Sequence, residues 1–520
     1  MSRSNQHAQL VDGLRQPACW PDGIGPDRVI ETHISTVLLV GGYAYKIKKP
    51  LDLGFLDFST LARRRHFCQE EIRLNGRLAP DVYLEVIPIG GTPEAPQPFA
   101  SPAIEYAVRM RRFDQTGLLS EHLELVTPSL VDRLADRLAG FHAEIGRVDS
   151  RATWGDPEAV LFPMLENFAQ IRPLTEDTQA LSLLERIARW TEERAGQLAP
   201  LLRKRKAGGF IRECHGDLHL GNIALDGDAL LIFDGIEFNP ALRWIDVISE
   251  LAFLLMDLDQ KDLQPLARRL LNRYLELSGD YEALPLLGFY QTYRAMVRAK
   301  VTAIRLDQPD ISPKMQEELT AGFSSYLQLA LRYTGEGGGG LIITHGLSGS
   351  GKSTQTMSCI ERLPAVRVRS DVERRRLAGI EGSRSSGSAL GGGIYATNFS
   401  ARTYERLQQL AEAIIQSGRV AIVDATFLRQ ADRQRFRKLA ADLDVPFLML
   451  DFRVAEAVLR QRIRQRQQQG SDPSEATLNV LEQQLATAEP LSEDELKYVV
   501  AVESDHLPMD EIRTILCVLD

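Results

Sequence analysis

The sequence predicts two domains: an α+β domain first, and then an α/β domain built on a parallel sheet. The length of 520 residues exceeds what one hydrophobic core organises. The segment YTGEGGGG at 333–340 holds five glycines in eight residues and predicts a flexible linker. Strand-like runs and then long helical patterns precede this segment, whereas short apolar runs alternate with amphipathic helices after it.

The composition is that of an ordinary globular protein, with 44% hydrophobic and 25% charged residues. The formal charge of -9 argues against a surface that coats nucleic acid, although a local basic groove stays open. Five scattered cysteines without a C-x-x-C pair indicate neither a disulfide framework nor a zinc knuckle. No apolar run reaches the ~18–20 residues of a membrane span. We therefore expect a cytoplasmic protein without a membrane partner.

The first domain is expected over 1–334, with a small lobe at about 28–110 and a helical large lobe at about 111–334. TVLLVGGYAYKIKK, starting at Thr36, has two β-rich runs around a Gly-Gly turn and predicts a hairpin. A helical pattern, LARRRHFCQEEIRLNGRLA, and a strand-like run, VYLEVIPI, follow it. The small lobe should therefore be a small sheet with one helix.

The loop HGDLHLGN contains three side chains of metal-binding type, His215, Asp217 and His219. A catalytic zinc site needs three such ligands that converge on the ion. Gly216 and Gly221 disfavour the helix that would align the two histidines. A metal hydrolase is therefore the weaker of two interpretations of this loop.

Phosphoryl transfer explains the same loop better. Asp217 could orient and deprotonate a hydroxyl, and Asn222, five residues later, could ligate Mg²⁺. Asp234, seventeen residues after Asp217, could bridge the metal to phosphates. Lys46 on the hairpin and Glu71 on the next helix, beside a second glutamate, supply the lysine and carboxylate that such a site also needs.

These motifs resemble the aminoglycoside-phosphotransferase branch of the protein-kinase-like fold. HGDLHLGN matches its H-G-D-x-x-x-x-N loop, and FDGIEF stands where related kinases have D-F-G. The resemblance implies an ATP site whose interlobe hinge falls in EYAVRMRRF at 105–113. The segment before the lysine strand lacks G-x-G-x-x-G, so another loop must cover the phosphates. The resemblance does not establish an aminoglycoside as the acceptor.

The second domain, expected at 341–520 after a linker at 335–340, opens with a phosphate-binding motif. GLSGSGKS at 346–353 matches G-x-x-x-x-G-K-[ST] between a strand and a helix, as its mechanism requires. The glycines let backbone amides turn toward the β-phosphate, the lysine should reach the β/γ oxygens, and the serine hydroxyl should ligate Mg²⁺. The expected nucleotide-contacting residues here are Gly346, Gly349, Gly351, Lys352, Ser353 and Thr354.

Three further segments predict the rest of this site. Asp424 ends the strand-like IVDAT, where a carboxylate can hold a metal-bound water. Asp371 and Arg374 lie one helical turn apart in RSDVERRRL, as a base and an acceptor clamp would. The arginine-rich helix AEAVLRQRIRQRQQQ could supply a mobile cation to the transferred phosphoryl group, with Arg466 preferred and Arg462 second.

Residues 341–500 resemble P-loop kinases of the AAA-33 and zeta-toxin-like group, which includes polynucleotide kinase. GLSGSGKST, SDVERRR, VDAT and the arginine-rich helix carry the resemblance. It implies the base and clamp roles for Asp371 and Arg374. The pairing of the two domains resembles a bacterial fusion family of bifunctional phosphotransferase/ATP-binding proteins, over nearly the whole chain.

The leading hypothesis is a bifunctional ATP-dependent kinase, with Mg²⁺ at both sites, that phosphorylates hydroxyls of small molecules. GTP as donor and nucleic-acid ends as acceptor for the second domain stay open. One alternative is a nucleotide-binding regulator in which one domain senses ATP and gates the other. Another is a polynucleotide 5′-hydroxyl kinase whose basic groove would include VRVRSDVERRR. The sequence leaves the acceptors and the oligomeric state undetermined.

Overall fold

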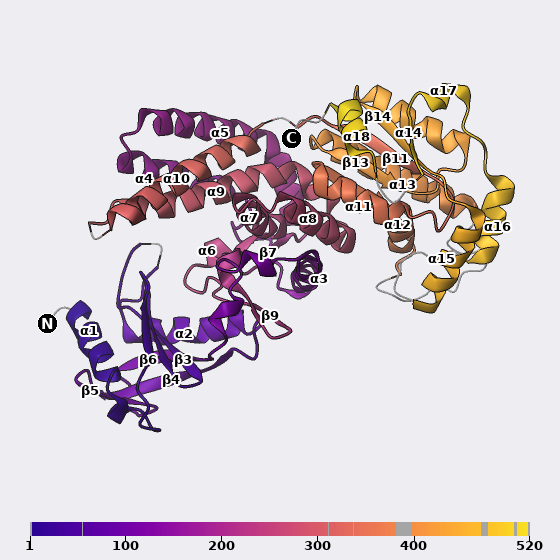
Figure 1. Cartoon of the computed structure of the whole chain (residues 1–520). Coiled ribbons are helices and arrows are strands. Elements are labelled where there is room, and N and C mark those ends of the chain that lie inside the picture. The colour runs from indigo at the N-terminus through magenta and orange to yellow at the C-terminus, as the bar shows by residue number, and fades with distance from the viewer. Residues whose placement is uncertain are drawn as a thin grey trace. The chain divides into compact units, whose positions relative to one another are not determined.

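The computed structural model describes residues 3–54, 56–309, 311–335, 337–380, 397–469, 477–503 and 507–517. The chain forms two compact units, whose elements Figure 1 labels in chain order. The first unit comprises Met1–Leu130, Gly140–Asp257 and Tyr293–Tyr326, and the second comprises Val131–Ala139, Leu258–Thr292 and Leu327–Asp520.

The small lobe of the first unit is built on a six-stranded antiparallel sheet in the order β1-β2-β3-β6-β4-β5. The predicted hairpin is confirmed, because β2 and β3 pair on either side of Gly41 and Gly42. Most of the expected hinge segment 105–113 forms the strand β6, because its alternating apolar residues pair with β3 and β4. Only Arg112 and Phe113 follow that strand. The strands are β1 (Arg28–Glu31), β2 (Ser35–Val40), β3 (Tyr43–Lys48), β4 (Tyr83–Thr92), β5 (Ala95–Pro98) and β6 (Glu105–Arg111).

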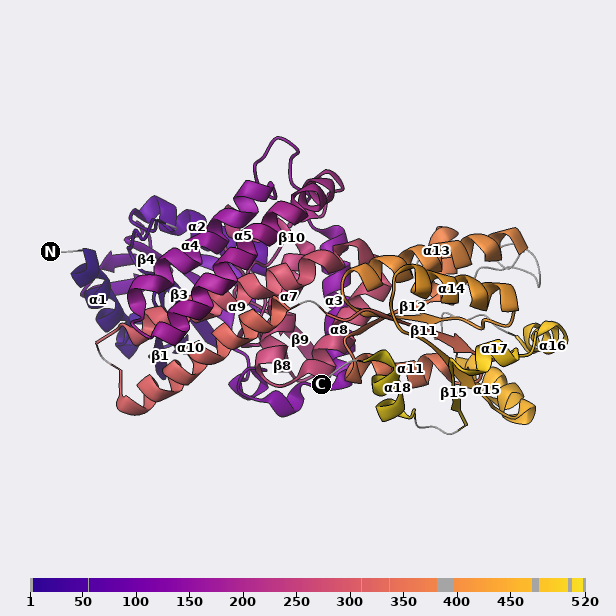
Figure 2. The same cartoon turned by 90° about the horizontal axis from the view of Figure 1, so that it is seen from above.

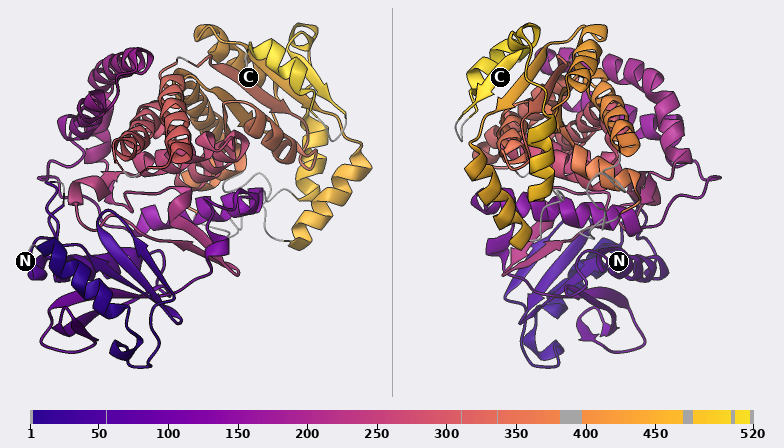
Figure 3. Two further views of the ribbon diagram at one scale, coloured as in Figure 1. Left: turned by 60° about the vertical axis from the view of Figure 1, so that its left-hand side comes forward. Right: turned by 90° about the vertical axis from the view of Figure 1, so that its right-hand side faces the viewer.

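Two helices pack on this sheet, whereas the sequence predicted one. Helix α2 (Leu61–Asn75) packs against β4 and β6, and Thr60 caps its start by accepting the backbone N–H of Arg63. Helix α1 (Arg3–Leu14) lies beside the sheet at the N-terminal end of the chain (Figure 3). Its Leu10 and Leu14 are buried with side chains of β2, β3 and β4.

The helical part after the sheet follows the prediction of a mainly helical large lobe. Two short antiparallel pairs, β7 with β10 and β8 with β9, interrupt the helices around HGDLHLGN. These strands are β7 (Ile211–Glu213), β8 (Ile223–Asp226), β9 (Ala229–Ile232) and β10 (Trp244–Asp246). The helices are α3 (Pro128–Glu144), α4 (Pro157–Ile171), α5 (Thr178–Ala207), α6 (Pro240–Arg243), α7 (Val247–Gln260), α8 (Gln264–Ser278), α9 (Leu284–Leu306) and α10 (Pro313–Tyr333).

The second unit contains the predicted parallel sheet, with five strands in the order β12-β13-β11-β14-β15. The three central strands are short and almost fully buried, as apolar runs between crossover helices require. The strands are β11 (Gly340–His345), β12 (Ala365–Arg369), β13 (Val420–Asp424), β14 (Phe447–Phe452) and β15 (Val499–Val502). Because β11 starts at Gly340, that residue belongs to the sheet and not to the expected linker. Glu336 of the linker is outside the described residues.

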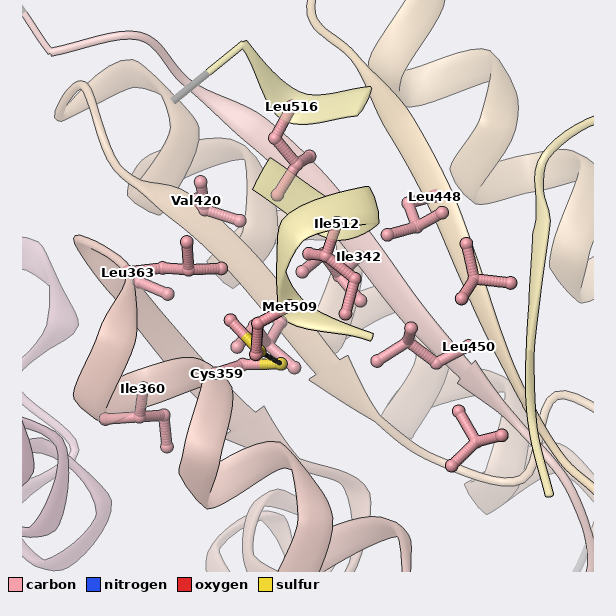
Figure 4. Packing of buried hydrophobic residues seen from close by; sticks show 14 of the residues in the cluster. Ile342, Cys359, Ile360, Leu363, Val420, Leu448, Leu450, Met509, Ile512 and Leu516 are labelled. Carbon is pink, nitrogen blue, oxygen red and sulfur yellow. Dashed lines mark hydrogen bonds between the residues drawn. The ribbon is translucent and has the colours of Figure 1, made fainter. Parts of the chain in front are cut away.

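Helices cover both faces of this sheet. The first face is packed by α11 and α18, whose Cys359, Met509 and Ile512 meet strand residues such as Ile342 and Leu450 (Figure 4). Helices α13 and α14 contact the strands as well. Helix α8, which precedes the linker in sequence, also belongs to this unit and packs against α11 and β12 (Figure 2). The helices are α11 (Lys352–Arg362), α12 (Ser370–Leu377), α13 (Thr397–Gln416), α14 (Gln430–Asp442), α15 (Glu456–Gln469), α16 (Leu478–Thr487), α17 (Glu493–Leu496) and α18 (Met509–Leu516).

Within the described residues, every helix is too short or too polar to cross a lipid bilayer.

Candidate active sites

Lys46 is the first residue of the site in the first unit. Side chains alternate between the two faces of a strand, and Tyr45 and Ile47 of β3 are buried on the α1 side. Lys46 therefore points to the opposite face. Its Nζ lies 2.9 Å from Oε1 of Glu71 on α2 and 2.5 Å from Oδ1 of Asp234, after β9. The fold thus brings together three residues that are far apart in the sequence.

A second lysine, which the sequence analysis missed, lies beside the first. Lys48 is two residues further along the same face, donates to Oε2 of Glu71 at 2.6 Å, and also donates to Oε1 of Glu237. All three side chains are almost completely buried. The pattern AYKIKK contained a signal for Lys48, since residues two apart share a face of a strand. Nothing local indicated Glu237, because it lies 189 positions away.

Lys46, Lys48 and Glu71 of this cluster are held in the ionised form by their neighbours, whereas burial raises the pKa of Glu237. Burial by itself raises the pKa of Glu71, but Lys46 and Lys48 outweigh that effect and lower it to about 2. Burial by itself lowers the pKa of Lys48, but the carboxylates of Glu237 and Glu71 outweigh that effect and raise it. For Lys46, Asp234 and Glu71 likewise overcome the effect of burial and raise the pKa well above its usual value.

Asp217 is held as a carboxylate in the loop between β7 and β8. Asn222 donates its Nδ2 to the backbone oxygen of Asp217 at 2.9 Å and to its Oδ2 at 3.1 Å. His219 Nε2 lies 3.4 Å from the same Oδ2. Burial by itself raises the pKa of Asp217, but His219, His215 and Arg298 together lower it well below its usual range.

The two histidines of this loop hold its backbone. His215 accepts the N–H of Asp217 at 3.3 Å and donates Nε2 to the backbone oxygen of Phe233 at 2.9 Å, and burial lowers its pKa, which favours the neutral ring. His219 Nδ1 accepts the N–H of Gly221 at 3.1 Å. Over the part of the chain that the structure describes, His215, Asp217 and His219 do not form a group of converging metal ligands. The metal-hydrolase interpretation therefore has no support in the geometry.

Glu250 on α7 is another residue that the sequence analysis missed. Its Oε2 accepts the N–H of Gly216 at 2.7 Å, and its Oε1 lies 3.1 Å from Nε2 of His142. His142, Cys214 and Glu250 are the one group of three potential metal ligands among the described residues. Since the carboxylate already accepts from the loop and from His142, its evident role is to anchor HGDLHLGN to α7.

Asp234 lies in a turn that side chains of the small lobe hold in place. Its φ of 61° is in the left-handed region, which aspartate tolerates better than most residues. Its N–H donates to Oη of Tyr83 at 3.0 Å, and the N–H of Gly235 donates to Oδ1 of Asn75 at 2.6 Å. These contacts direct the Asp234 carboxylate toward Lys46.

The glycine loop of the second unit connects β11 to α11 as predicted. Gly346, Gly349 and Gly351 have φ values of 142°, 86° and 90°, a region that residues with a Cβ avoid. A Cβ on Gly346 would also lie 2.9 Å from the backbone oxygen of Phe452. Lys352, the first residue of α11, donates its Nζ to two carbonyl oxygens of the loop at 2.8 and 2.9 Å.

Ser353 and Asp424 meet at the carboxyl end of the sheet. Ser353 Oγ donates to Oδ2 of Asp424 at 2.6 Å. Asp424 is the last residue of β13, and parallel strands end at the same edge of a sheet, so its carboxylate reaches the glycine loop. A hydroxyl and a carboxylate are oxygen ligands of the kind Mg²⁺ prefers.

Asp371 and Arg374 line a cavity of about 520 Å³ together with Lys352, Ser353 and Thr354. Arg374 Nη1 lies 3.8 Å from Oδ1 of Asp371, one turn earlier on α12. Most of the sequence-predicted residues of this site, Asp424 among them, are therefore on the wall of one cavity, although Gly346 is not.

Arg369, which also lines that cavity, is a further residue that sequence reasoning missed. Its Nη1 donates to Oε1 of Glu276 on α8 at 3.1 Å, and its Nε lies 3.9 Å from Oδ2 of Asp424. Glu276 Oε2 lies 3.6 Å from the buried Arg367. A helix from before the linker thus supplies a carboxylate to the edge of this site.

Of the arginines on α15, Arg462 lines the cavity beside the glycine loop. Its Nη1 is 3.5 Å from the backbone oxygen of Gly349. The side chain of Arg466, the preferred candidate from the sequence, is outside the described residues, so its role stays a prediction. The neighbouring helix α16 contributes Gln484, which accepts the N–H of Ser348 at 2.9 Å.

Comparison with known families defines the class of protein. Residues 61–287 match the phosphotransferase enzyme family APH, and residues 341–491 match the AAA domain family AAA-33. The first match includes the predicted residues of the first site except Lys46, and the second match includes those of the second site. The chain therefore belongs to the family that fuses an aminoglycoside-phosphotransferase-like domain to a P-loop domain, and its two kinase-like domains support phosphotransfer.

Relatives within this family occur in mycobacteria. The Mycobacterium tuberculosis (strain ATCC 25618 / H37Rv) protein named "Uncharacterized protein Rv2004c" is 31% identical over 421 residues, which cover 80% of this chain and 81% of the relative. The Mycobacterium bovis protein named "Uncharacterized protein Mb2027c" matches with the same identity and coverage.

Some solved structures match parts of the chain. A Plasmodium vivax ethanolamine kinase has a TM-score of 0.38 at 11% identity, and the match covers 59% of this chain and 82% of that chain. A gluconokinase from Sinorhizobium meliloti 1021 has a TM-score of 0.24 at 20% identity, with 34% of this chain and 90% of that chain covered.

Proposed function

We propose that each unit transfers the γ-phosphoryl group of ATP to a hydroxyl group of an acceptor. One observation carries this proposal. Each site combines a lysine suited to phosphate, a pair of oxygen ligands suited to Mg²⁺, and a further aspartate suited to take a proton. A purely structural domain has no need of all three groups together.

In the first unit, Asp217 acts as the base. The acceptor oxygen attacks the γ-phosphorus, the bond to the β,γ-bridging oxygen breaks, and the hydroxyl proton moves to Asp217. Lys46 holds phosphate oxygens. Asn222 and Asp234 fit a magnesium ion, because the Asn222 amide donates its Nδ2 to Asp217 and so presents its Oδ1 elsewhere. When bound, Mg²⁺ neutralises charge on the phosphates.

In the second unit, Asp371 receives the proton in the same reaction. Lys352 holds the β- and γ-phosphates, and the Ser353 hydroxyl with Asp424 fits the ligand set of Mg²⁺. Arg374 lies beside Asp371 and orients the acceptor.

The test measures transfer of the labelled γ-phosphate by the full chain, with a metabolite extract and with 5′-hydroxyl oligonucleotides as acceptors. Asp217→Asn should remove one set of labelled products and Asp371→Asn another, each by about 10²-fold or more, as loss of a proton acceptor predicts. Asp149→Asn and Asp442→Asn, on exposed surfaces of the two units, are the matched controls and should keep both sets.

Wild-type rates in both variants would refute the two-base mechanism. Nucleotide binding without transfer to any acceptor would favour the regulator in which one unit senses ATP. Label on oligonucleotides alone would favour a polynucleotide kinase activity of the second unit.

A further inference from the structure

The side chain of Gln484 fastens helix α16 to the glycine loop of the second unit. Its Oε1 accepts the backbone N–H of Ser348 at 2.9 Å, and its Nε2 donates to Oγ of the same residue at 3.0 Å. An amide group that both accepts from and donates to one residue is fixed in orientation. The Gln484 amide therefore has a defined place at the loop.

The N–H of Ser348 is one of the donors that this loop offers to a phosphate. In a loop of the type G-x-x-x-x-G-K-[ST], the backbone N–H groups and the lysine surround the β- and γ-phosphates. Ser348 is the third residue of that motif, and it lines the cavity of about 520 Å³ that also holds Asp371, the proposed base. The γ-phosphate must reach this cavity, because it is transferred to a hydroxyl beside Asp371. Ser348 therefore lies on the γ-phosphate side of the loop.

A phosphate oxygen and Oε1 of Gln484 compete for this N–H. The single hydrogen forms a strong, near-linear bond to one acceptor at a time. A charged oxygen forms a bond roughly twice as strong as a neutral one, so the phosphate should win. The net gain is smaller by the two bonds that Gln484 loses. Gln484 therefore lowers the affinity of the loop for a nucleotide that has a γ-phosphate.

Among the described residues, a small apolar cluster also holds α16 in place. Leu481 is buried there with Leu459 and Ile463 of α15, and Leu347 of the loop packs against them. Segments with few buried apolar contacts are the ones that open locally. Loss of the Gln484 bonds should therefore loosen α16. This helix forms part of the wall of the Asp371 cavity through Val480, Gln483, Gln484 and Thr487.

We propose that Gln484 makes the second unit distinguish ATP from ADP. The γ-phosphate of ATP takes the N–H of Ser348 and displaces the Gln484 amide, whereas ADP leaves both bonds of Gln484 in place. The acceptor side of the cavity is thus loosened only when a transferable phosphate is bound. This inference rests on the proposed function of that unit, to which it adds a residue that decides nucleotide specificity.

Hydrogen–deuterium exchange of the full chain, read by mass spectrometry, tests the proposal at the second site alone, because each peptide reports its own segment. The two probes are Mg-ADP and the magnesium complex of an ATP analogue with an imido β,γ-bridge, which prevents transfer. We expect both nucleotides to protect the loop peptide 346–353. Only the analogue should speed exchange in the α16 peptide 478–487, by about 2- to 10-fold, the equivalent of one hydrogen bond.

Three variants sharpen the test. Gln484→Met keeps the length of the side chain without its hydrogen bonds. It should lower the analogue concentration that half-protects the loop peptide by about 2- to 10-fold and leave that of ADP unchanged. Gln484→Glu should raise the analogue concentration, because its carboxylate holds the N–H more strongly and repels the γ-phosphate. Glu482→Gln, an exposed position on the same helix, is the matched control and should change neither concentration.

The possible outcomes separate the competition from the proposed kinase activity. If Gln484→Met binds the analogue no more tightly than the wild type does, or if ADP and the analogue act alike on the α16 peptide, the competition is overturned and the kinase activity stands. Protection of the loop peptide by neither nucleotide would contradict the proposed function of this unit. Should Gln484→Met not fold, Ser348→Ala removes only the bond to Oγ and should lower the analogue concentration by a smaller factor; an unchanged value would also overturn the competition.

Discussion

Lys48→Met should lower the free energy of unfolding of the first unit more than the loss of any exposed charge does. Adding Glu237→Gln should restore part of that free energy. The wild-type cluster contains two lysines, Lys46 and Lys48, against the three carboxylates of Glu71, Glu237 and Asp234. Its net charge is therefore -1. Lys48→Met makes it -2, and adding Glu237→Gln returns it to -1.

The magnitude follows from burial. Lys48, Glu71 and Glu237 have side-chain exposures of 1%, 0% and 4%, so water cannot solvate a carboxylate that loses its partner. Removing one member of a buried pair costs about 3–5 kcal/mol. The double variant Lys48→Met/Glu237→Gln should be more stable than Lys48→Met alone by about 1 kcal/mol or more, since contacting residues couple by about 0.5–3 kcal/mol.

Urea unfolding followed by tryptophan fluorescence measures these free energies. All four tryptophans, at positions 20, 154, 190 and 244, belong to the first unit, so the signal reports that unit. Lys49→Met is the matched control. Lys49 pairs at the surface with Glu31, whose side chain is 52% exposed, and its loss should cost below about 1 kcal/mol.

Additive costs would refute this reasoning. If the double variant loses the sum of the two single losses to within about 0.5 kcal/mol, Lys48 and Glu237 do not stabilise each other in solution. A loss for Lys48→Met no larger than that for Lys49→Met would show that water reaches the cluster.

Two further predictions concern the same residues and the edge of the second site. Because the pKa of Glu71 is lowered from 4.5 to about 2, its contribution to the free energy of unfolding is present above about pH 4.5 and is lost as the pH falls toward 2. Glu71→Gln should therefore flatten the acid dependence of the stability that tryptophan fluorescence reports. An unchanged slope would contradict this prediction. Glu276→Gln should raise the KM for ATP of the second unit several-fold, because Arg369, without that carboxylate, should pair more closely with Asp424. Asp136→Asn, on the exposed surface, should leave the KM for ATP unchanged. Equal KM values in the two variants would contradict the mechanism.

Several features of the fold and of both sites could be predicted from short stretches of sequence. The hairpin that carries Lys46, the parallel sheet and the glycine loop were predicted correctly, because turn glycines, apolar runs and helix starts are local signals. Asp217 and Asn222 are five residues apart in one loop, so their contact needed no knowledge of the rest of the chain.

Long-range partners could not be predicted in this way. Glu237 reaches Lys48 over 189 positions, and Glu250 holds Gly216 over 34, yet each glutamate alone looks like an ordinary acidic residue. The second helix on the small-lobe sheet and the extension of the strand β6 into the expected hinge were missed for a similar reason. Packing and strand pairing decide such features, and both depend on distant residues.

The sequence by itself determined which chemical groups the protein has for phosphoryl transfer: HGDLHLGN, GLSGSGKS and the aspartates that follow each. Within each of the two motifs, the spacing of the residues reflects covalent geometry over a few positions, which the surrounding fold cannot alter. Only the tertiary structure decided which lysine pairs with which glutamate, and that Glu276 of a helix before the linker reaches Arg369. It also brought Arg435 into the cavity of Asp371. These arrangements depend on burial, because the charges attract strongly only where the fold has excluded water.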